Sequence, residues 1–288
     1  MTRFYTNPVD KLHPNDFYPL LKMAIEEDCP ENDITSESIF SESDWGKASL
    51  ISREDGILSG TGVLLAIQEI YGSSFRVTQF ILEGQPIFRG DEIAKLEAPT
   101  RLLLRMERIL LNFIQYLSGI SSTVQKLVVQ YPNLLILDTR KTLPGYRRLV
   151  KYAVYMGGGA NHRIHLSDMA LIKDNHIALC GSITKTIMSI RNKFPQKKIE
   201  IEIDTLSQLQ EAISCSPDII MLDNFSNQDT RDAINLIRSS GLKIRIECSG
   251  GVTPEKLKFL SEFGEIGVSM GYLTHTTRFM DIGLDIEY

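Results

Sequence analysis

The segment from Asp138 to His176 concentrates cationic side chains. It holds seven Arg or Lys residues against three acids, a net charge of +4 in a chain whose formal charge is −5. Positive charge gathered locally in an acidic protein indicates a pocket for a small anion. Arg140 stands beside Lys141, and a guanidinium can hold a carboxylate or phosphate through two parallel hydrogen bonds while an ammonium adds a point charge. The alternative for this pair, with Thr139 before it, is a solvated turn with surface ion pairs.

A glycine triplet precedes two further side chains that can carry a positive charge. Gly157–Gly159 leads through Ala160 and Asn161 to His162 and Arg163. Glycines let a backbone approach a ligand closely and present its N–H groups to an anion. A flexible connector is the alternative interpretation. Arg163 favours anion binding, because a cationic neighbour keeps a histidine neutral unless an anion is present.

Lys173 follows a short apolar run and admits two chemical uses. Desolvated among apolar residues, its amine could form a Schiff base with a carbonyl substrate, as in barrel aldolases. Close to substrate carboxylates it would instead stay charged and hold them, and the many cations nearby favour this use. The alternative interpretation is that Lys173 only forms a surface ion pair with Asp174 and takes no part in function. His165 and His176 are interpreted as structural.

Two acids, Glu202 and Asp223, come at the ends of two neighbouring apolar runs. Carboxylates placed together can hold a ribose diol, or a Mg²⁺ ion that bridges a pyrophosphate, because Mg²⁺ prefers hard oxygen ligands. Helix capping is the alternative, and it applies best to Asp204, because a helical stretch begins directly after it.

The run from Ser249 to Glu255 is typical of a strand, a turn and the start of a helix. Gly250 and Gly251 allow a tight turn, Thr253 is the expected N-cap, and Pro254 suits the first helical position. Unpaired N–H groups and the helix dipole make such a turn a phosphate site. Gly271, two residues after Ser269, is expected to line the same site.

Short apolar runs alternate with helical segments from Leu134 onward, and this pattern predicts a parallel sheet. The expected strands are Leu134–Leu137, Ala170–Ile172, Ile199–Ile203, Ile219–Leu222, Ile244–Ile246 and Ile266–Val268. Each is followed by polar or glycine residues, and in a (β/α) barrel the carboxyl ends of the strands build the active site. We therefore predict an α/β fold with an incomplete (β/α) barrel.

The residues before the barrel read as an α+β sandwich domain. A helix over Phe17–Ile25 and strands over Ala48–Ser52, Phe75–Leu82 and Glu92–Leu96 precede a strong helix from Arg101 that is expected to break at Gly119. The predicted domains are 1–119, the α+β domain, and 120–275, the barrel, with 276–288 as a tail that returns to the first domain.

The bulk composition excludes several classes of protein. A formal charge of −5 disfavours nucleic acid as a partner, and no apolar run approaches the roughly 20 residues of a membrane span. The N-terminus lacks the apolar core of a secretory signal. The four cysteines are widely spaced and form no CxxC pair, which argues against a zinc knuckle and fits a reducing compartment. The expected location is the cytoplasm.

These motifs closely resemble those of the quinolinate phosphoribosyltransferases. In the predicted barrel they are Asp138–Gly145, Asn161–Arg163, Leu171–His176, Met221–Asn224 and Ser249–Gly251. Outside it they are Glu27–Asp28, Asp33–Thr35, Glu107–Arg108, Leu111–Asn112, Leu117–Ile120 and Leu273–His275. The likeness covers nearly the whole chain in order.

The resemblance implies a reaction of quinolinate with phosphoribosyl pyrophosphate that gives nicotinate mononucleotide, pyrophosphate and CO₂ in NAD biosynthesis. It also implies Mg²⁺ as cofactor and a homodimer in which Arg108 reaches the partner's active site. By matching position, quinolinate would be held by Arg108, Thr139, Arg140, Lys141, His162, Arg163 and Lys173. Glu202 and Asp223 would hold the ribose and the metal, and the 5′-phosphate would bind Ser249, Gly250, Gly251 and Gly271. Lys141, Lys173, Glu202 and Asp223 would be the catalytic set.

Two positions depart from the family pattern. His165 stands where the family usually has glycine, and Cys248 where it usually has alanine. They keep open a related molybdenum-transport-associated protein of the same superfamily. The residues are also compatible with a Schiff-base aldolase that uses Lys173, and with a non-catalytic regulator that binds sugar phosphates.

Overall fold

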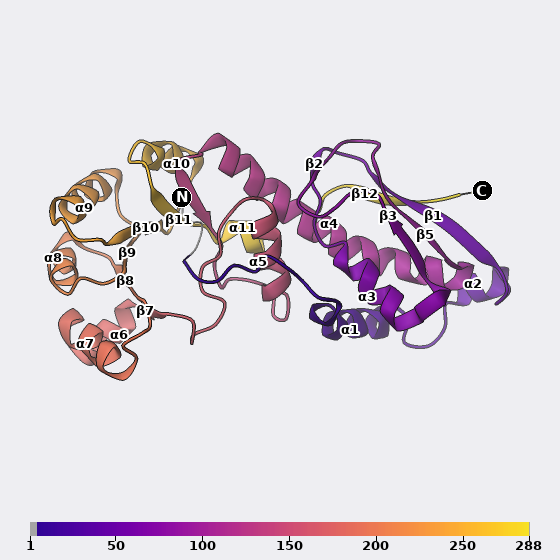
Figure 1. The fold of residues 1–288 in the computed structure, drawn as a ribbon, viewed down its shortest axis with the longest axis horizontal. Coiled ribbons are helices and arrows are strands. Elements are labelled where there is room, and N and C mark those ends of the chain that lie inside the picture. The colour runs from indigo at the N-terminus through magenta and orange to yellow at the C-terminus, as the bar shows by residue number, and fades with distance from the viewer. Residues whose placement is uncertain (1–4, 288) are drawn as a thin grey trace. The chain divides into compact units, whose positions relative to one another are not determined.

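The computed structural model describes residues 5–287, which divide into two compact units (Figure 1). Among the described residues, the first comprises 5–7, 127–140 and 159–271 and is called the barrel unit. The second comprises 8–126, 141–158 and 272–287 and is called the sheet unit. Neither unit is continuous in sequence, which differs from the domains expected at 1–119 and 120–275.

The barrel unit is built on a parallel sheet of six strands in the order β6-β11-β10-β9-β8-β7. The strands are β6 (Leu134–Leu137), β7 (Ala170–Ile172), β8 (Ile199–Ile203), β9 (Ile219–Asp223), β10 (Arg245–Ser249) and β11 (Ile266–Ser269). β6 and β7 end the sheet, and Ala160 continues it beyond β6 through a parallel bridge to Leu137. The predicted incomplete barrel of parallel strands is confirmed.

One predicted strand is displaced. The run Ile244–Ile246 was expected to end before Glu247, but β10 extends to Ser249 and pairs with β9 along its whole length. Ile246 and Cys248 point to one face of β10, and Glu247 points to the other, because side chains alternate along a strand. Glu247 is therefore inside the strand and buried, not at its exit.

Five helices of the barrel unit follow the strands and lie outside the sheet (Figure 1). They are α6 (Asp174–Cys180), α7 (Ile183–Lys193), α8 (Leu206–Ser214), α9 (Asn227–Ser239) and α10 (Pro254–Ser261). The expected start of α10 is confirmed, since Pro254 is at its first position and the Thr253 side chain accepts from the Lys256 N–H. Thr205, and not Asp204, caps α8 by accepting from Gln208.

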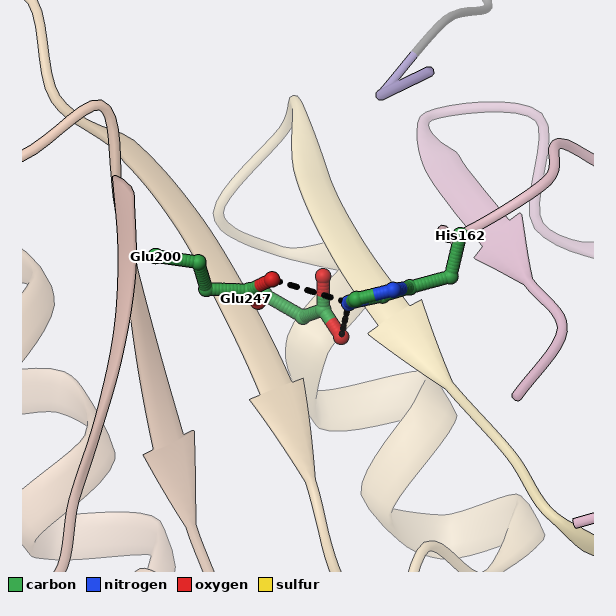
Figure 2. A group of neighbouring side chains, drawn as sticks. All are labelled: His162, Glu200 and Glu247. Carbon is green, nitrogen blue, oxygen red and sulfur yellow. Dashed lines mark ion pairs between the residues drawn. The ribbon is translucent and has the colours of Figure 1, made fainter. Parts of the chain in front are cut away.

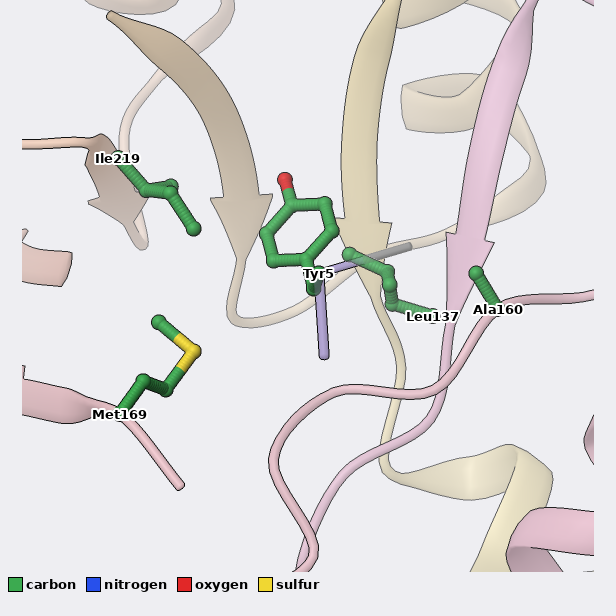
Figure 3. Close-up of a cluster of buried hydrophobic side chains, with 5 residues drawn as sticks. All are labelled: Tyr5, Leu137, Ala160, Met169 and Ile219. Atoms are coloured by element: carbon green, nitrogen blue, oxygen red, sulfur yellow. The ribbon is translucent and has the colours of Figure 1, made fainter. Parts of the chain in front are cut away.

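The interior of the barrel unit contains a cluster of apolar side chains around Tyr5 (Figure 3). Its members are Tyr5, Leu137, Ala160, Met169 and Ile219. Gly267 on β11 makes room for the tyrosine, because a Cβ at that position would lie 2.2 Å from the phenol oxygen. The N-terminal segment thus fills the barrel from within.

The sheet unit contains a four-stranded antiparallel sheet in the order β12-β1-β5-β3. These strands are β1 (Trp45–Ser52), β3 (Arg76–Gln79), β5 (Glu92–Pro99) and β12 (Ile282–Ile286), and β2 (Gly56–Ile57) pairs with β4 (Pro86–Ile87). The helices are η1 (Pro14–Asp16), α1 (Tyr18–Asp28), α2 (Ile34–Ile39), α3 (Gly62–Tyr71), η2 (Gly72–Ser74), most of α4 (Thr100–Gln130), α5 (Arg147–Met156) and α11 (Tyr272–His275). The C-terminal tail is strand β12, and Leu284 lies opposite Leu50 of β1.

The predicted break at Gly119 is wrong, because α4 continues through it to Gln130. The glycine is required by a close contact instead: a Cβ there would lie 2.1 Å from the carbonyl oxygen of Arg278. Ser118, the residue before it, accepts from the Ser59 N–H at 3.0 Å. Although α4 is 31 residues long, no helix within residues 5–287 is long and apolar enough to cross a membrane.

Candidate active site

The carboxyl ends of the six parallel strands lie at one edge of the sheet and carry most of the predicted site residues. Thr139 and Arg140 follow β6, Lys173 follows β7, Glu202 and Asp223 close β8 and β9, Ser249 closes β10, and Gly271 follows β11. The barrel unit thus brings together residues that are more than a hundred positions apart in the chain. Arg108 and Lys141 belong to the sheet unit.

Asp138 ties the glycine-rich loop to the end of β6. Its buried carboxylate accepts from the Asn161 side-chain amide at 2.7 Å and from the His162 N–H at 3.0 Å. Asp138 therefore fixes the backbone of the neighbouring loop.

The two guanidiniums of the barrel unit, Arg140 and Arg163, are close enough to repel. The pKa of Arg163 is lowered, first by burial and then by the charge of Arg140. Both Nε atoms are buried and have no hydrogen-bond partner among the described residues. One end of the Arg163 guanidinium is held in place, because its Nη1 donates to the Met169 carbonyl at 3.2 Å. Two crowded cations with unused donors are suited to bind an anion.

Lys173 forms an ion pair with Glu202, with 2.6 Å between Nζ and Oε2. This corrects the expected alternative of a pair with Asp174. The ion pair engages the amine that a Schiff base with a carbonyl substrate would require. His176 has the structural role expected of it, because its Nδ1 accepts from the Lys173 N–H at 2.9 Å at the start of α6.

Three carboxylates crowd the ends of β8 and β9. The pKa of Asp223 is raised, first by burial and then by the charges of Glu202 and Asp204. Asn224 donates from its side-chain amide to Asp223 at 2.7 Å. Mutual repulsion of this kind is relieved by a cation, so the donor set fits Mg²⁺ and the hydroxyls of a sugar.

The turn after β10 has the geometry that its glycines predicted. Gly250 has φ +80° and Gly251 has φ +53°, both in the left-handed region. The Asn224 N–H donates to the Ser249 carbonyl at 3.0 Å and joins the turn to the end of β9. Gly250 packs so closely on Asn224 that a Cβ would lie 2.1 Å from its Oδ1.

The two site residues of the sheet unit are held differently. Lys141 is exposed, and its carbonyl accepts from the Thr274 hydroxyl at 2.7 Å, which ties the 138–145 motif to the 273–275 motif. Arg108 is exposed on α4. Arg105, one turn earlier, has a buried Nε without a hydrogen-bond partner among the described residues.

Sequence reasoning missed a buried polar cluster inside the barrel, formed by His162, Glu200 and Glu247 (Figure 2). His162 Nε2 lies 2.9 Å from a Glu200 oxygen and 3.8 Å from a Glu247 oxygen. Burial is the main cause that raises the pKa of each carboxyl to about 8. The alternation IEIEI over β8 was the available signal, since it places Glu200 on the same face as Glu202.

Glu247 makes the stability of the protein depend on pH. Its pKa is raised from 4.5 to about 8 on folding, so between these values the folded state holds more protons than the unfolded chain. The free energy of unfolding therefore falls as pH rises through this window, by up to about 1.4 kcal/mol per pH unit for one proton. Urea unfolding from pH 5 to pH 8 should show this slope, and Glu247→Gln should reduce it by the contribution of one proton, because Glu200 keeps its own raised pKa. Parallel curves for both proteins would refute the assignment.

The open parallel barrel, with two crowded guanidiniums, a group of carboxylates and a glycine turn at its strand ends, defines an α/β-barrel enzyme for anionic substrates. Family models agree: the quinolinate phosphoribosyl transferase C-terminal domain matches residues 120–285, and the N-terminal domain matches residues 33–118. The chain belongs to the quinolinate phosphoribosyltransferase family.

Individual relatives match over nearly the whole chain. A probable nicotinate-nucleotide pyrophosphorylase (carboxylating) from Bacillus subtilis is 39% identical, covering 93% of this chain and 92% of the relative. The enzyme of that name from Mycobacterium leprae is 36% identical, covering 92% and 95%. The structure of the nicotinate-nucleotide pyrophosphorylase from Francisella tularensis has a TM-score of 0.91 at 34% identity, covering 98% of this chain and 100% of that one.

Proposed function

We propose that this protein transfers the phosphoribosyl group of phosphoribosyl pyrophosphate to quinolinate, releasing pyrophosphate and CO₂ and forming nicotinate mononucleotide for NAD biosynthesis. The observation that carries the proposal is the pair Arg140 and Arg163, whose buried Nε donors have no partner among the described residues. A dicarboxylate would supply the missing acceptors and relieve the repulsion between the two charges. The family membership and the names of the relatives support the same reaction.

In the proposed complex the cations hold quinolinate and aim its ring nitrogen at the sugar carbon. Arg140, Arg163 and Lys173 would bind the two carboxylates, with Thr139 and His162 beside them. Lys141 and Arg108 are included among the quinolinate-binding residues because they match the family's motifs. Fixing two reactants in this way can contribute several kcal/mol, about 7–11 in the best cases. Loss of CO₂ next to the ribosylated nitrogen then leaves an electron pair that the cationic ring stabilises, and the ring takes up a proton.

Glu202 and Asp223 would act on the ribose part of phosphoribosyl pyrophosphate. As pyrophosphate leaves, positive charge develops on the sugar, and Glu202 and Asp223 could stabilise it electrostatically. The same two side chains would hold Mg²⁺, whose role is to neutralise charge on the pyrophosphate. Ser249, Gly250, Gly251 and Gly271 would bind the 5′-phosphate through backbone N–H groups.

The test is incubation with quinolinate, phosphoribosyl pyrophosphate and Mg²⁺, followed by analysis for nicotinate mononucleotide. We expect equal amounts of nucleotide, pyrophosphate and CO₂. Turnover with nicotinate but not quinolinate would contradict the substrate assignment. Binding of phosphoribosyl pyrophosphate without release of pyrophosphate would indicate the non-catalytic regulator. Failure with both ring acids would favour the molybdenum-transport-associated relative.

We propose further that the active enzyme is a homodimer in the cytoplasm. All four cysteines are free, which fits a reducing compartment. The exposed Arg108 would reach the site of the partner subunit, as the resemblance implies. Nucleic acid and membranes are not expected partners.

The shared site predicts complementation between two inactive variants. Arg108→Ala should abolish activity and Lys173→Ala should lower it by about 10²–10³-fold, in both cases without unfolding the dimer. Mixed and refolded together, they should form hybrid dimers in which one of the two sites has both residues, so activity returns. Size-exclusion chromatography checks assembly, and an assay of the mixture checks recovery. Arg101→Ala, on the same helix, is the control and should keep activity alone. A mixture as inactive as its components would contradict the role of Arg108 across the interface.

A further inference from the structure

The buried cluster of His162, Glu200 and Glu247 connects the barrel interior to the cationic side of the proposed site. Glu200 lies on β8 and Glu247 on β10, and both point toward the imidazole from the inner face of the sheet (Figure 2). All three side chains are buried, and their ligand atoms lie within 4.8 Å of one another. Tyr5 also packs beside the imidazole, with 5.9 Å between the ring centroids.

The hydrogen bonds of His162 define which nitrogen carries its proton. Nδ1 accepts from the Arg163 N–H at 2.8 Å, so it has no hydrogen of its own. Nε2 therefore carries the hydrogen and faces Glu200 at 2.9 Å and Glu247 at 3.8 Å. The ring is held between the carboxylates on one side and the backbone of Arg163 on the other.

The same tautomer argues against a metal ion in this cluster. One imidazole and two carboxylates are a familiar donor set for a divalent cation. Coordination would require the lone pair of Nε2, and the proton would have to move to Nδ1, where the Arg163 N–H already points. The cluster is therefore better explained as a buried polar support for the imidazole than as a metal site.

We propose that Glu200 and Glu247 are positioning residues for quinolinate binding, acting through His162. The carboxylates orient the imidazole, the imidazole holds the backbone of Arg163, and the Arg163 guanidinium stands beside Arg140 where the dicarboxylate binds. Tyr5 packs beside the imidazole ring. This inference rests on the proposed function, because it assigns a role within the quinolinate half of that site.

The decisive variants are Glu200→Leu and Glu200→Gln. Leucine fills a similar volume without an acceptor, so it removes the polar contact between Glu200 and His162 Nε2. We expect Glu200→Leu to raise KM for quinolinate about tenfold or more, as for loss of one buried polar contact. KM for phosphoribosyl pyrophosphate should stay near the wild-type value, and all kinetics are measured well below the melting temperature recorded for each variant. Glutamine retains an acceptor and should restore most of the affinity.

A double-mutant cycle tests the connection through the imidazole. If Glu200 acts through His162, Glu200→Leu should add little to the KM of a His162→Ala protein. Cys248→Ala is the matched control, since Cys248 is buried on β10 directly after Glu247 but points to the opposite face. It should leave both KM values unchanged.

Three results would overturn the inference. They are an unchanged KM for quinolinate in Glu200→Leu, an equal rise of KM for both substrates, and additive effects in the cycle. Stoichiometric zinc in the purified wild-type enzyme would also overturn it in favour of a metal site. Wild-type turnover is measured in the same experiment, so failure of the proposed function is recognised separately by the absence of nicotinate mononucleotide.

Discussion

Replacing Lys173 by alanine should lower kcat/KM for nucleotide formation by about 10²–10³-fold, as for loss of one preorganised electrostatic contact in a transition state. Lys173 is placed where the two halves of the site meet, since its Nζ lies 2.6 Å from Glu202 and it follows β7 on the cationic side. The pKa of Asp223 is raised, first by burial and then by the charges of Glu202 and Asp204, and the charge of Lys173 offsets part of this rise. Without Lys173, Asp223 and Glu202 would repel each other more strongly, and the pKa of Asp223 would rise further.

Lys173→Arg is the control for charge. It keeps a cation near Glu202 and should cost much less, on the order of tenfold, because a planar guanidinium does not reproduce the geometry of an ammonium. The measurement is kcat/KM for quinolinate across pH 5 to 9, with a melting curve for each variant. In Lys173→Ala the acid limb of the profile should move to higher pH.

The two Lys173 variants distinguish phosphoribosyl transfer from Schiff-base chemistry. An aldolase would lose all activity in both, and the wild-type enzyme would be trapped by borohydride in the presence of its substrate. A Lys173→Ala protein that retains more than a tenth of wild-type kcat/KM would contradict the role assigned to this residue.

The barrel could be predicted from the sequence because its strands are short, rich in β-branched residues and bounded by polar turns. β8 is a clear example: Ile199–Ile203 was predicted with the bounds that the structure shows. β10 was predicted less well, because Arg245, Glu247 and Ser249 interrupt the apolar run. A polar side chain in a strand normally indicates its end or its solvent face, but in this barrel β8 and β10 each carry a buried glutamate, Glu200 and Glu247.

The long helix α4 shows a second limit. Glycine lowers helix propensity, so a break at Gly119 was the local expectation. The helix nevertheless continues through Gly119, and glycine is needed there because only glycine allows the Arg278 carbonyl to approach the helix. This contact joins residues 159 positions apart, and the pattern around Gly119 contains no information about it.

The positions of the candidate site residues could be predicted where they follow strands and could not where they lie within them. Lys173, Asp223 and the Ser249 turn were singled out because the carboxyl ends of parallel strands meet at one edge. The cluster that Glu200 and Glu247 form with His162 was missed, since their proximity to His162 depends on how the sheet curves. Strand order and curvature arise from tertiary packing and not from local spacing.

Replacing Gly250 by alanine should weaken the binding of phosphoribosyl pyrophosphate on the order of 100-fold, whereas Gly251→Ala should cost on the order of tenfold. Both glycines have positive φ, so each substitution incurs about 1–2 kcal/mol of backbone strain. They differ in their surroundings. A Cβ on Gly250 would lie 2.1 Å from Asn224 Oδ1 and 2.9 Å from its backbone nitrogen, whereas a Cβ on Gly251 meets nothing within 4 Å.

Comparing Gly250→Ala with Gly251→Ala separates the effect of a changed turn shape from the effect of backbone strain, because both variants carry the strain. At Gly250 the new methyl group must displace Asn224, whose N–H donates to the Ser249 carbonyl and whose amide donates to Asp223. The turn and the end of β9 would move together, so KM for phosphoribosyl pyrophosphate should rise while KM for quinolinate changes little. Steady-state kinetics with each substrate varied, and thermal stabilisation by phosphoribosyl pyrophosphate with Mg²⁺, measure both effects. Equal losses in the two variants would mean that strain alone is responsible and that the contact between Gly250 and Asn224 does not shape the phosphate site.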